Sequence, residues 1–396
     1  MYRSVTEEEI SKRLNRFQKK LTAHEVDGAL IVQKTDLYYF SGTDQDAHLW
    51  VPASGRPFLM VRKSMERARE DSPVRSIVPL PGFSRLPELI REHTGKRPKR
   101  LGLEMDILPA AFYLIYQRHF PDAEPVDISP LVRSVRMIKS DYEISCITRA
   151  AEMADRMYEK VPGFLSEAMT ETELALRIEA FYRNMGHPAV VHTRGFNMEC
   201  LYGQVMSGKN AAVPSNSAGP TGGKGLGPFC SQGAGMDKIE EHEPVIIDYV
   251  ANVEGYIADQ TRIFSIGRLS DEFHKAHSVM LEVQDAISQE GKPGMRAEIL
   301  YDIALKIVKK AGLSRGFMGY PDPVPFVAHG VGLDLDEWPV IGRKSDILLR
   351  EGMVVAAEPK IVIPGKGVVG IENTWVVTAD GMKKLNRFPD AIFECC

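Results

Sequence analysis

The sequence has few cysteines, and none of them is spaced like a metal ligand pair. The five are Cys146, Cys200, Cys230, Cys395 and Cys396 in a chain of 396 residues. An odd number of scattered cysteines is typical of reduced thiols rather than of a disulfide framework. We therefore predict a cytoplasmic protein in which the last two cysteines form an exposed tail.

Long apolar runs and an excess of one charge are also lacking. No stretch reaches the length needed to span a bilayer, and the first nine residues are polar and acidic, unlike a signal peptide. Lys and Arg total 49 against 53 Asp and Glu, which gives a net charge of −4. This balance offers no basic surface for nucleic acid or anionic lipid. We expect neither class of partner.

The first third of the chain alternates strand-like and helix-like segments. With 396 residues, two domains are expected. Such alternation is typical of an α/β layer domain, and we assign it to residues 1–135. The predicted strands are 26–32, 57–61 and 101–104, and the predicted helices are 10–21 and 86–92.

Two helix starts mark a second domain. Ser140 and Asp141 begin a strongly helical stretch that runs to Tyr158. Thr170 begins another, because Glu173 stands where a capping box requires it. We assign residues 136–396 to the second domain. Within it, residues 215–235 are rich in Gly, Ser and Pro, which indicates either a flexible surface loop or the rim of an active site.

A hairpin predicted in residues 243–267 brings two aspartates together. Two β-rich runs, 245–250 and 256–266, flank a turn signal at 252–255. With the turn centred between Val253 and Glu254, Asp248 lies directly opposite Asp259. Opposed residues have Cβ atoms about 4.5–5.5 Å apart, so the pair requires a cation or exposure to water.

A second hairpin repeats this arrangement near the C-terminus. Residues 354–363 and 368–377 are β-rich and flank Pro364-Gly365-Lys366. Glu358 and Glu372 are equidistant from Gly365. One facing carboxylate pair could be a solvated surface, but two pairs within apolar strands are costly to bury unpaired.

A histidine completes the candidate metal site. His329 lies in an apolar stretch and is followed by small glycines, which allow the backbone to approach a site closely. A lone histidine of this kind is more often structural. Four carboxylates and one imidazole together suit Mn²⁺, Fe²⁺, Co²⁺ or Zn²⁺ in a paired site better than a structural zinc.

These residues resemble the pita-bread metallopeptidase family, which includes Xaa-Pro aminopeptidases, prolidases, methionine aminopeptidases and creatinase. The shared feature is the order Asp-x10-Asp, His, Glu-Pro, Ile-Glu. The segments that match the family's motifs are 35–42 (TDLYYFSG), 136–140 (RMIKS), 255–262 (GYIADQTR), 351–354 (EGMV) and 357–359 (AEP). The resemblance covers nearly the whole chain and implies an α/β N-terminal domain followed by an α+β pita-bread catalytic domain.

The resemblance also implies roles for each site residue. Asp248 would chelate one of two divalent ions, His329 and Glu358 would hold the other, and Asp259 and Glu372 would bridge them. A water between the ions would be the nucleophile, since two cations lower its pKa. Thr261 would orient one of these carboxylates. A homodimer is implied, with Tyr38-Tyr39 or residues 44–50 near the partner's cleft.

Four positions depart from the proline-specific members of the family. Those members have histidines where this chain has Ser215 and Pro325, a Val-His-Glu motif where it has Leu335-Asp336-Glu337, and an arginine where it has Gly370. Such groups hold the scissile carbonyl and pass protons. We therefore expect weak turnover of simple Xaa-Pro dipeptides. Substitute donors could be His192, Arg194 or Asp336, and each could equally be an ordinary loop residue.

The favoured function is a metal-dependent peptidase or amide hydrolase of the Xaa-Pro dipeptidase or aminopeptidase type, with Glu358, His192 and Asp336 as candidate catalytic residues. Its substrate would be a peptide or a small amide. Two alternatives remain open: a creatinase-like hydrolase or lyase of a small non-peptide compound, and a non-catalytic binding protein of the same fold.

Overall fold

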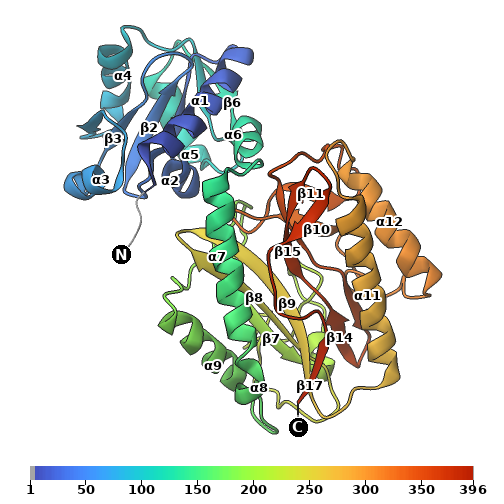
Figure 1. Cartoon of the computed structure of the whole chain (residues 1–396). Helices are drawn as coiled ribbons and strands as arrows, with labels where there is room; N and C mark the ends of the chain where they lie inside the picture. Colours follow the sequence, from blue (N-terminus) through green and yellow to red (C-terminus); the bar gives the residue numbers. More distant parts are fainter. Residues whose placement is uncertain (1–4, 396) are drawn as a thin grey trace. The chain divides into compact units, whose positions relative to one another are not determined.

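The computed structural model describes residues 5–395 and separates them into two compact units (Figure 1). The first unit ends at Arg136 and also takes in Arg194–Asn197. The second unit comprises Met137–Thr193 and the remainder of the described chain from Met198.

The first unit is built on a mixed six-stranded sheet in the order β4-β3-β2-β1-β5-β6. Strands β1, β5 and β6 are parallel to one another, whereas β2 is antiparallel to both of its neighbours. The elements are α1 (Glu7–Ala23), β1 (Gly28–Ile31), α2 (Lys34–Ser41), β2 (Ala47–Pro52), β3 (Phe58–Val61), α3 (Met65–Asp71), β4 (Ile77–Pro79), the 3-10 helix η1 (Phe83–Arg85), α4 (Leu86–Thr94), β5 (Arg100–Leu103), α5 (Ala110–His119), β6 (Glu124–Asp127) and α6 (Ser129–Arg136).

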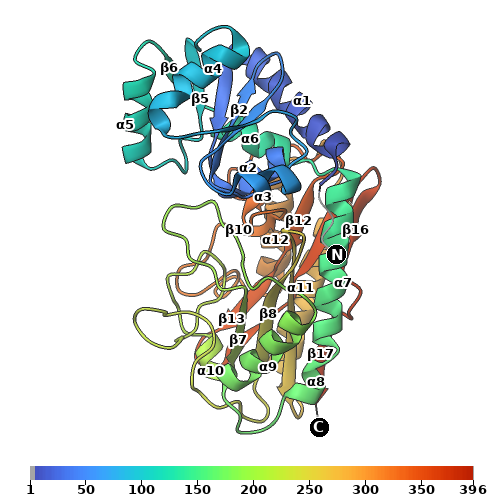
Figure 2. The same ribbon diagram turned by 90° about the vertical axis from the view of Figure 1, so that its left-hand side faces the viewer.

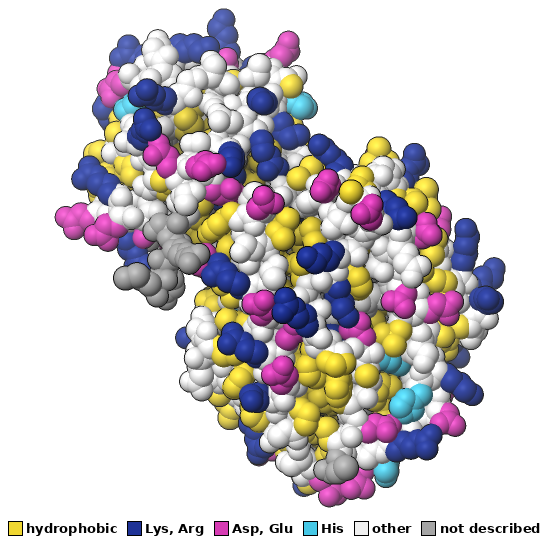
Figure 3. Space-filling model, in the orientation of Figure 1, with side chains coloured by type: hydrophobic (Ala, Val, Ile, Leu, Met, Phe, Trp, Pro, Cys, Tyr) yellow, Lys and Arg dark blue, Asp and Glu magenta, His cyan; other side chains and the backbone are white. Residues whose placement is uncertain are grey.

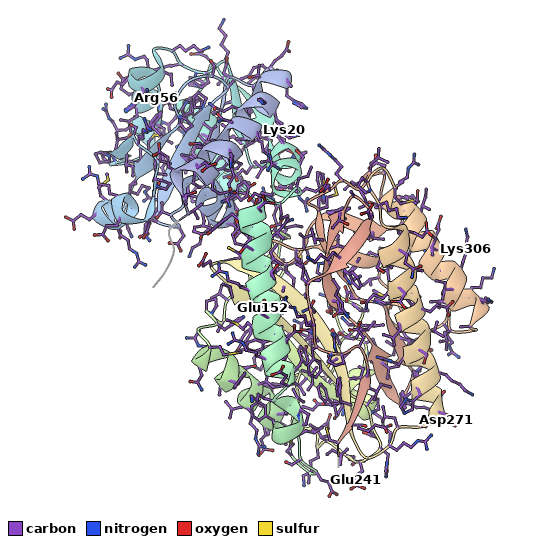
Figure 4. The ribbon with its side chains drawn as sticks, in the orientation of Figure 1. Lys20, Arg56, Glu152, Glu241, Asp271 and Lys306 are labelled. Carbon is purple, nitrogen blue, oxygen red and sulfur yellow. The ribbon has the colours of Figure 1, made fainter. Side chains whose placement is uncertain are left out.

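The second unit places its strands between two groups of helices (Figure 1). Helix α7 packs on β8 and β9, and α9 packs on β7, whereas α11 and α12 pack on the strands of the C-terminal half. Its helices are α7 (Asp141–Tyr158), α8 (Val161–Phe164), α9 (Glu171–Asn184), α10 (Gly208–Ala211), α11 (Asp271–Glu290) and α12 (Ala297–Lys310). Figure 4 labels Asp271 and Lys306, exposed charged residues on α11 and α12.

Three sheets make up the strand layer of this unit. Their orders are β17-β9-β8-β7, β11-β10-β12-β15-β16 and the two-stranded β13-β14. The strands are β7 (Gly203–Ser207), β8 (Val245–Val253), β9 (Tyr256–Ile266), β10 (Phe326–Gly330), β11 (Glu337–Gly342), β12 (Val354–Ala357), β13 (Lys360–Ile363), β14 (Gly367–Gly370), β15 (Asn373–Thr378), β16 (Gly381–Lys384) and β17 (Ile392–Cys395). Every residue of β9 is buried, so this strand runs through the core.

The two predicted helix starts are confirmed. At Thr170 the side-chain oxygen accepts from the Glu173 backbone N–H at 3.1 Å, and Glu173 Oε2 accepts from the Thr170 N–H at 2.7 Å. Ser140 and Glu143 form the same capping box at the start of α7. Each box satisfies two backbone donors that a helix leaves unpaired at its first turn.

The C-terminal cysteines differ from the prediction. Cys395 pairs with Ile266 of β9 in a parallel ladder, so it belongs to a strand and not to an exposed tail. The hydrogen bonds of a sheet edge stabilise this terminal segment, an effect that a short C-terminal sequence does not reveal. Cys396 lies outside the described residues.

Long loops connect the strands on one side of the second unit. Residues 185–202 lead from α9 to β7, and residues 212–244 lead from α10 to β8 (Figure 2). On the face drawn in Figure 3, basic and acidic side chains are interspersed. In residues 5–395, no helix is both long enough and apolar enough to cross a bilayer.

Candidate metal centre

The first predicted carboxylate pair comes from the β8–β9 hairpin, but in a different register. Asp248 pairs with Thr261, and Asp259 pairs with Val250. The turn is therefore centred between Glu254 and Gly255, and the prediction that the two aspartates are directly opposite is wrong. Both turn residues have positive φ, 55° and 86°, as a tight two-residue turn requires.

The two aspartates nevertheless lie on the same face of the sheet. Moving the centre of the turn by one residue shifts each cross-strand partner by two positions, and residues two apart on a strand share a face. Asp248 and Asp259 are thus diagonal neighbours instead of directly opposed ones. Both line the same cavity.

The second carboxylate pair has the predicted register. Lys360 of β13 pairs with Gly370 of β14, and Ala357 of β12 pairs with Asn373 of β15. Positions 358 and 372 therefore fall opposite each other, where the long hairpin passes from one sheet to another. Both strands are interrupted at these positions, where the backbone of Glu372 bridges instead to Thr261 of β9, and both glutamates line the cavity.

His329 lies on β10 with its two ring nitrogens in different surroundings. Nδ1 is 3.0 Å from the carbonyl oxygen of Leu335, so it is placed to donate its proton there. Nε2 faces the carboxylates, at 4.0 Å from Asp259 Oδ2 and 3.8 Å from both Glu358 Oε1 and Glu372 Oε1. A proton on Nδ1 leaves the Nε2 lone pair available for a metal ion.

All five predicted residues line one cavity of about 100 Å³. Asp259, His329 and Glu372 form the tightest group, with one ligand atom from each lying within 4.8 Å of the others. Ligand bonds of about 2.0–2.2 Å to one ion place neighbouring ligand atoms roughly 3–4 Å apart. These three buried side chains therefore fit one divalent ion.

A cation of the protein itself occupies the other side of the carboxylate cluster. Lys360 extends from β13, and its Nζ lies 3.0 Å from Asp248 Oδ2 and 2.8 Å from Glu358 Oε2 and Glu372 Oε2. Its side chain is 1% exposed. The residues present consequently fit a metal ion at the His329 side of the cluster, whereas on the other side Lys360 Nζ is hydrogen-bonded to three of the carboxylates.

Burial and mutual repulsion dominate the charge state of the carboxylates. Burial, together with Glu372 and Asp248, raises the pKa of Asp259 well above its usual range. Burial also raises the pKa of Glu358 to about 7, although Lys360 opposes the shift. For Glu372, Lys360 and His329 outweigh burial and lower the pKa to about 2. Glu372 is therefore the most firmly ionised member of the cluster.

Hydrogen bonds from neighbouring residues of β9 fix the position of Glu372. The Thr261 hydroxyl donates to Glu372 Oε2 at 2.8 Å, which confirms that Thr261 orients a carboxylate of the cluster. The buried Arg262 donates through Nη1 to the carbonyl oxygens of Thr261 and Glu372, at 2.8 and 2.9 Å. Strand β9 thus holds both the side chain and the backbone of Glu372.

The remaining predicted residues are placed unequally. Asp336 lines the cavity, with Oδ1 3.7 Å from His329 Nδ1. In the described part of the chain, His192 is not among the lining residues, and its carbonyl oxygen accepts from the Leu335 N–H at 2.8 Å. Arg194 belongs to the first unit, where Asp106 binds its guanidinium at 2.7 and 3.0 Å and Asp36 binds its Nη1.

The Gly-rich segment contributes to the wall of the cavity. Residues 217–221 and Gln232 line it together with residues 198–204. Residues 215–235 could be either a flexible surface loop or the rim of a site, and their position at the cavity agrees with the second interpretation. Sequence reasoning missed Lys360, which stands two residues after Glu358 at the first position of β13.

Comparison with known proteins decides the family. Residues 145–379 match metallopeptidase family M24, and residues 13–138 match the creatinase/prolidase N-terminal domain. The chain belongs to metallopeptidase family M24. The fold predicted for its two parts and the predicted class, a metal-dependent peptidase, are confirmed.

The relatives of this M24 peptidase match it over nearly its full length. A Xaa-Pro dipeptidase of Pyrococcus furiosus is 27% identical over 96% of this chain and 98% of its own. A Xaa-Pro dipeptidase of Lactobacillus helveticus is 29% identical over 93% of this chain and 95% of its own. The solved structure of the prolidase from Pyrococcus horikoshii superimposes with a TM-score of 0.80 at 25% identity, covering 96% of this chain and 99% of that one.

Proposed function

We propose that this M24 peptidase hydrolyses the amide bond of short peptides, in the manner of a dipeptidase or aminopeptidase. The observation that supports this is the group of Asp259, His329 and Glu372 at the wall of a small cavity. The relatives from Pyrococcus furiosus and Lactobacillus helveticus are both Xaa-Pro dipeptidases, which supports the same class of substrate.

The ligand set favours a metal that accepts oxygen donors together with one imidazole. Mn²⁺ is our first proposal, and Co²⁺, Fe²⁺ and Zn²⁺ are the alternatives to compare with it. When bound, such an ion polarises the substrate carbonyl and makes water a better nucleophile at neutral pH.

The side chains around this position would orient the substrate and move protons. We propose that Glu358 Oε1, which faces His329 Nε2, takes the proton of the attacking water. Lys360 holds the other oxygen of Glu358 and so fixes the orientation of the carboxylate. Asp336, which is 34% exposed, is placed at the cavity to contact the polar end of a substrate.

Proline specificity is expected to be weak. The accessory donors of proline-specific members are replaced by Ser215, Pro325, Asp336 and Gly370. The loss of one oxyanion-type donor costs about 10²–10³ in rate. Only Asp336 among these four lines the cavity with a charged group.

The test combines metal removal with a panel of substrates. Chelator-treated protein, shown to be folded by circular dichroism, is assayed on Xaa-Pro and Xaa-Ala dipeptides before and after addition of Mn²⁺, Co²⁺ or Zn²⁺. We expect hydrolysis to disappear with chelation, to return with metal, and to be no faster for Xaa-Pro than for Xaa-Ala. Hydrolysis that persists after complete metal removal would contradict the proposal.

We further propose that the protein acts in the cytoplasm as a homodimer. The support is the resemblance to prolidase-like proteins. Within the region proposed to approach the partner, Tyr39 and Ala47–Pro52 are buried, so Asp44 and Asp46 are its exposed charged residues. Light scattering at working concentration tests the assembly, and a strictly monomeric mass would contradict it.

A further inference from the structure

Lys360 is the unusual feature of this metal centre. Its ammonium group has three N–H donors, and three carboxylates lie at hydrogen-bonding distance from Nζ: Asp248, Glu358 and Glu372. The full set of donors is therefore used within the cluster. The contacts of 2.8–3.0 Å are ordinary for a charged hydrogen bond between nitrogen and oxygen.

Two glutamates divide their oxygens between His329 and Lys360. Glu358 directs Oε1 toward His329 Nε2 and Oε2 toward Lys360 Nζ, and Glu372 does the same. A carboxylate that bridges two cations has this arrangement, with one oxygen at each. Here the cation on one side is the ammonium group of the protein itself.

The opposite strand is adapted to this lysine. Gly370 pairs with Lys360 across the β13–β14 hairpin. A Cβ atom at position 370 would stand 2.7 Å from Lys360 Cγ and 2.6 Å from the carbonyl oxygen of Pro359. Contacts this short cannot be accommodated in a packed interior. The glycine thus provides the space through which the lysine side chain enters the cluster.

We propose that Lys360 Nζ permanently takes the place of a second metal ion, and that this chain holds one divalent ion, bound by Asp259, His329 and Glu372. The proposal rests on the proposed function, since it assumes that the His329 side of the cluster binds metal. Asp248 and the Oε2 atom of Glu358 then serve the ammonium group instead of a metal.

Charge and packing both argue against a second ion. Four carboxylates carry up to four negative charges, and Lys360 neutralises one of them at close range. A second divalent ion would have to displace Nζ from its three partners. The displaced ammonium group would remain buried beside two dications, because its side chain is 1% exposed, and a buried charge without a partner is strongly unfavourable.

The test is the number of ions bound, measured independently of activity. Wild-type protein is freed of metal and titrated with Mn²⁺, and bound metal is counted by elemental analysis. Electron paramagnetic resonance then distinguishes an isolated Mn²⁺ from an exchange-coupled pair. The variant Lys360→Ala is compared with Lys366→Ala, a matched control whose exposed ammonium group contacts Glu272 at the end of the same hairpin.

We expect one Mn²⁺ per chain in the wild type and in Lys366→Ala, with the spectrum of an isolated ion. Lys360→Ala should bind two and give the spectrum of a coupled pair. Two ions in the wild type would overturn this inference and leave the proposed function intact. One ion in both the wild type and Lys360→Ala would also overturn it. No ion in folded wild-type protein would overturn the proposed function as well.

A crystallographic measurement on the wild type covers the case in which Lys360→Ala does not fold. Crystals grown with Mn²⁺ are examined for anomalous scattering. A single peak beside His329 Nε2, with Nζ still between Asp248 and Glu358, supports the proposal. A second peak between those carboxylates, with Lys360 displaced, overturns it.

Discussion

At the scale of single residues, each carboxylate of the centre is defined by what holds its second oxygen. Glu372 is the clearest case, since Oε2 receives hydrogen bonds from both Thr261 Oγ1 and Lys360 Nζ, at 2.8 Å each, while Oε1 faces His329. Asp259 has fewer donors and more repulsion, which keeps its pKa raised until a cation binds. The two residues should therefore respond to substitution in different ways.

Asp259→Asn removes a charge from the metal group while preserving its shape. Because Asp259 is one of only three residues in the tightest group, we expect metal affinity and hydrolysis to fall by more than about 100-fold, beyond the roughly 10–100-fold typical of residues that support a ligand. Isothermal titration with Mn²⁺ and dipeptide kinetics measure the two effects. Unchanged affinity would show that Asp259 is not a ligand.

Thr261→Val tests the support of Glu372 without touching a ligand. The substitution keeps the volume and removes the hydroxyl that donates to Oε2. We expect metal affinity to fall by about 10–100-fold. Thr378→Val is the control, because its hydroxyl donates to the Gly381 carbonyl at the far end of β15 and should leave metal binding unchanged. Equal affinities for the two variants would contradict the assigned role.

At the scale of elements, two hairpins and β10 bring the site together, and the turns decide which residues meet. The β13–β14 hairpin is predictable because Pro364-Gly365-Lys366 marks its turn clearly, and the register follows by counting outward. In the β8–β9 hairpin, residues 252–255 combine turn-forming residues with Val253, which favours strands, so the pattern allows more than one centre for the turn. The structure continues β8 through Val253 and turns at Glu254-Gly255, which no count from the sequence could establish.

Gly255→Ala tests the importance of that turn. Gly255 has φ +86°, a conformation that costs a residue with a Cβ atom about 1–2 kcal/mol. We expect the free energy of unfolding in urea to fall by about that amount. Gly163→Ala is the control, since Gly163 has no atom within 4 Å of the added Cβ and no positive φ. A loss for the control as large as that for Gly255→Ala would contradict this explanation.

At the scale of the whole molecule, the sequence predicts the architecture better than the chemistry of the centre. The alternation of strand and helix patterns predicts the α/β first unit, because burial periodicity and turn residues are local properties, whereas the pita-bread fold of the second unit follows only from the resemblance to the family. The role of Lys360 is not predictable from the sequence, because the direction of its side chain becomes clear only when β13 and β14 pair and place Gly370 opposite it. The positions of His192 and Arg194 depend on loops whose paths no local pattern determines.

Buried neutral histidines make the stability of the molecule depend on pH. Burial lowers the pKa of His48, His187 and His277 to about 4 from an ordinary value of 6.5. The folded state therefore binds fewer protons than the unfolded state between these values. The stability that these three histidines contribute by staying neutral is fully present above pH 6.5 and is lost as the pH falls toward 4. The three residues lie in both units, so the effect is not confined to the metal centre.

His277→Leu isolates one of these contributions. His277 is 4% exposed on α11, and within residues 5–395 its Nε2 has no hydrogen-bond partner, so leucine removes the titration at little cost in polar contacts. Urea unfolding at pH 7, 6 and 5, at constant Mn²⁺, should show a shallower fall in stability for the variant. The slope of unfolding free energy against pH should differ between the wild type and the variant by up to about one proton. Near pH 5, the variant should lose less stability than the wild type, by on the order of 1–3 kcal/mol. His242→Asn, a substitution of an exposed histidine, should follow the wild type. If His277→Leu loses stability as steeply as the wild type, protonation of His277 does not contribute to acid unfolding.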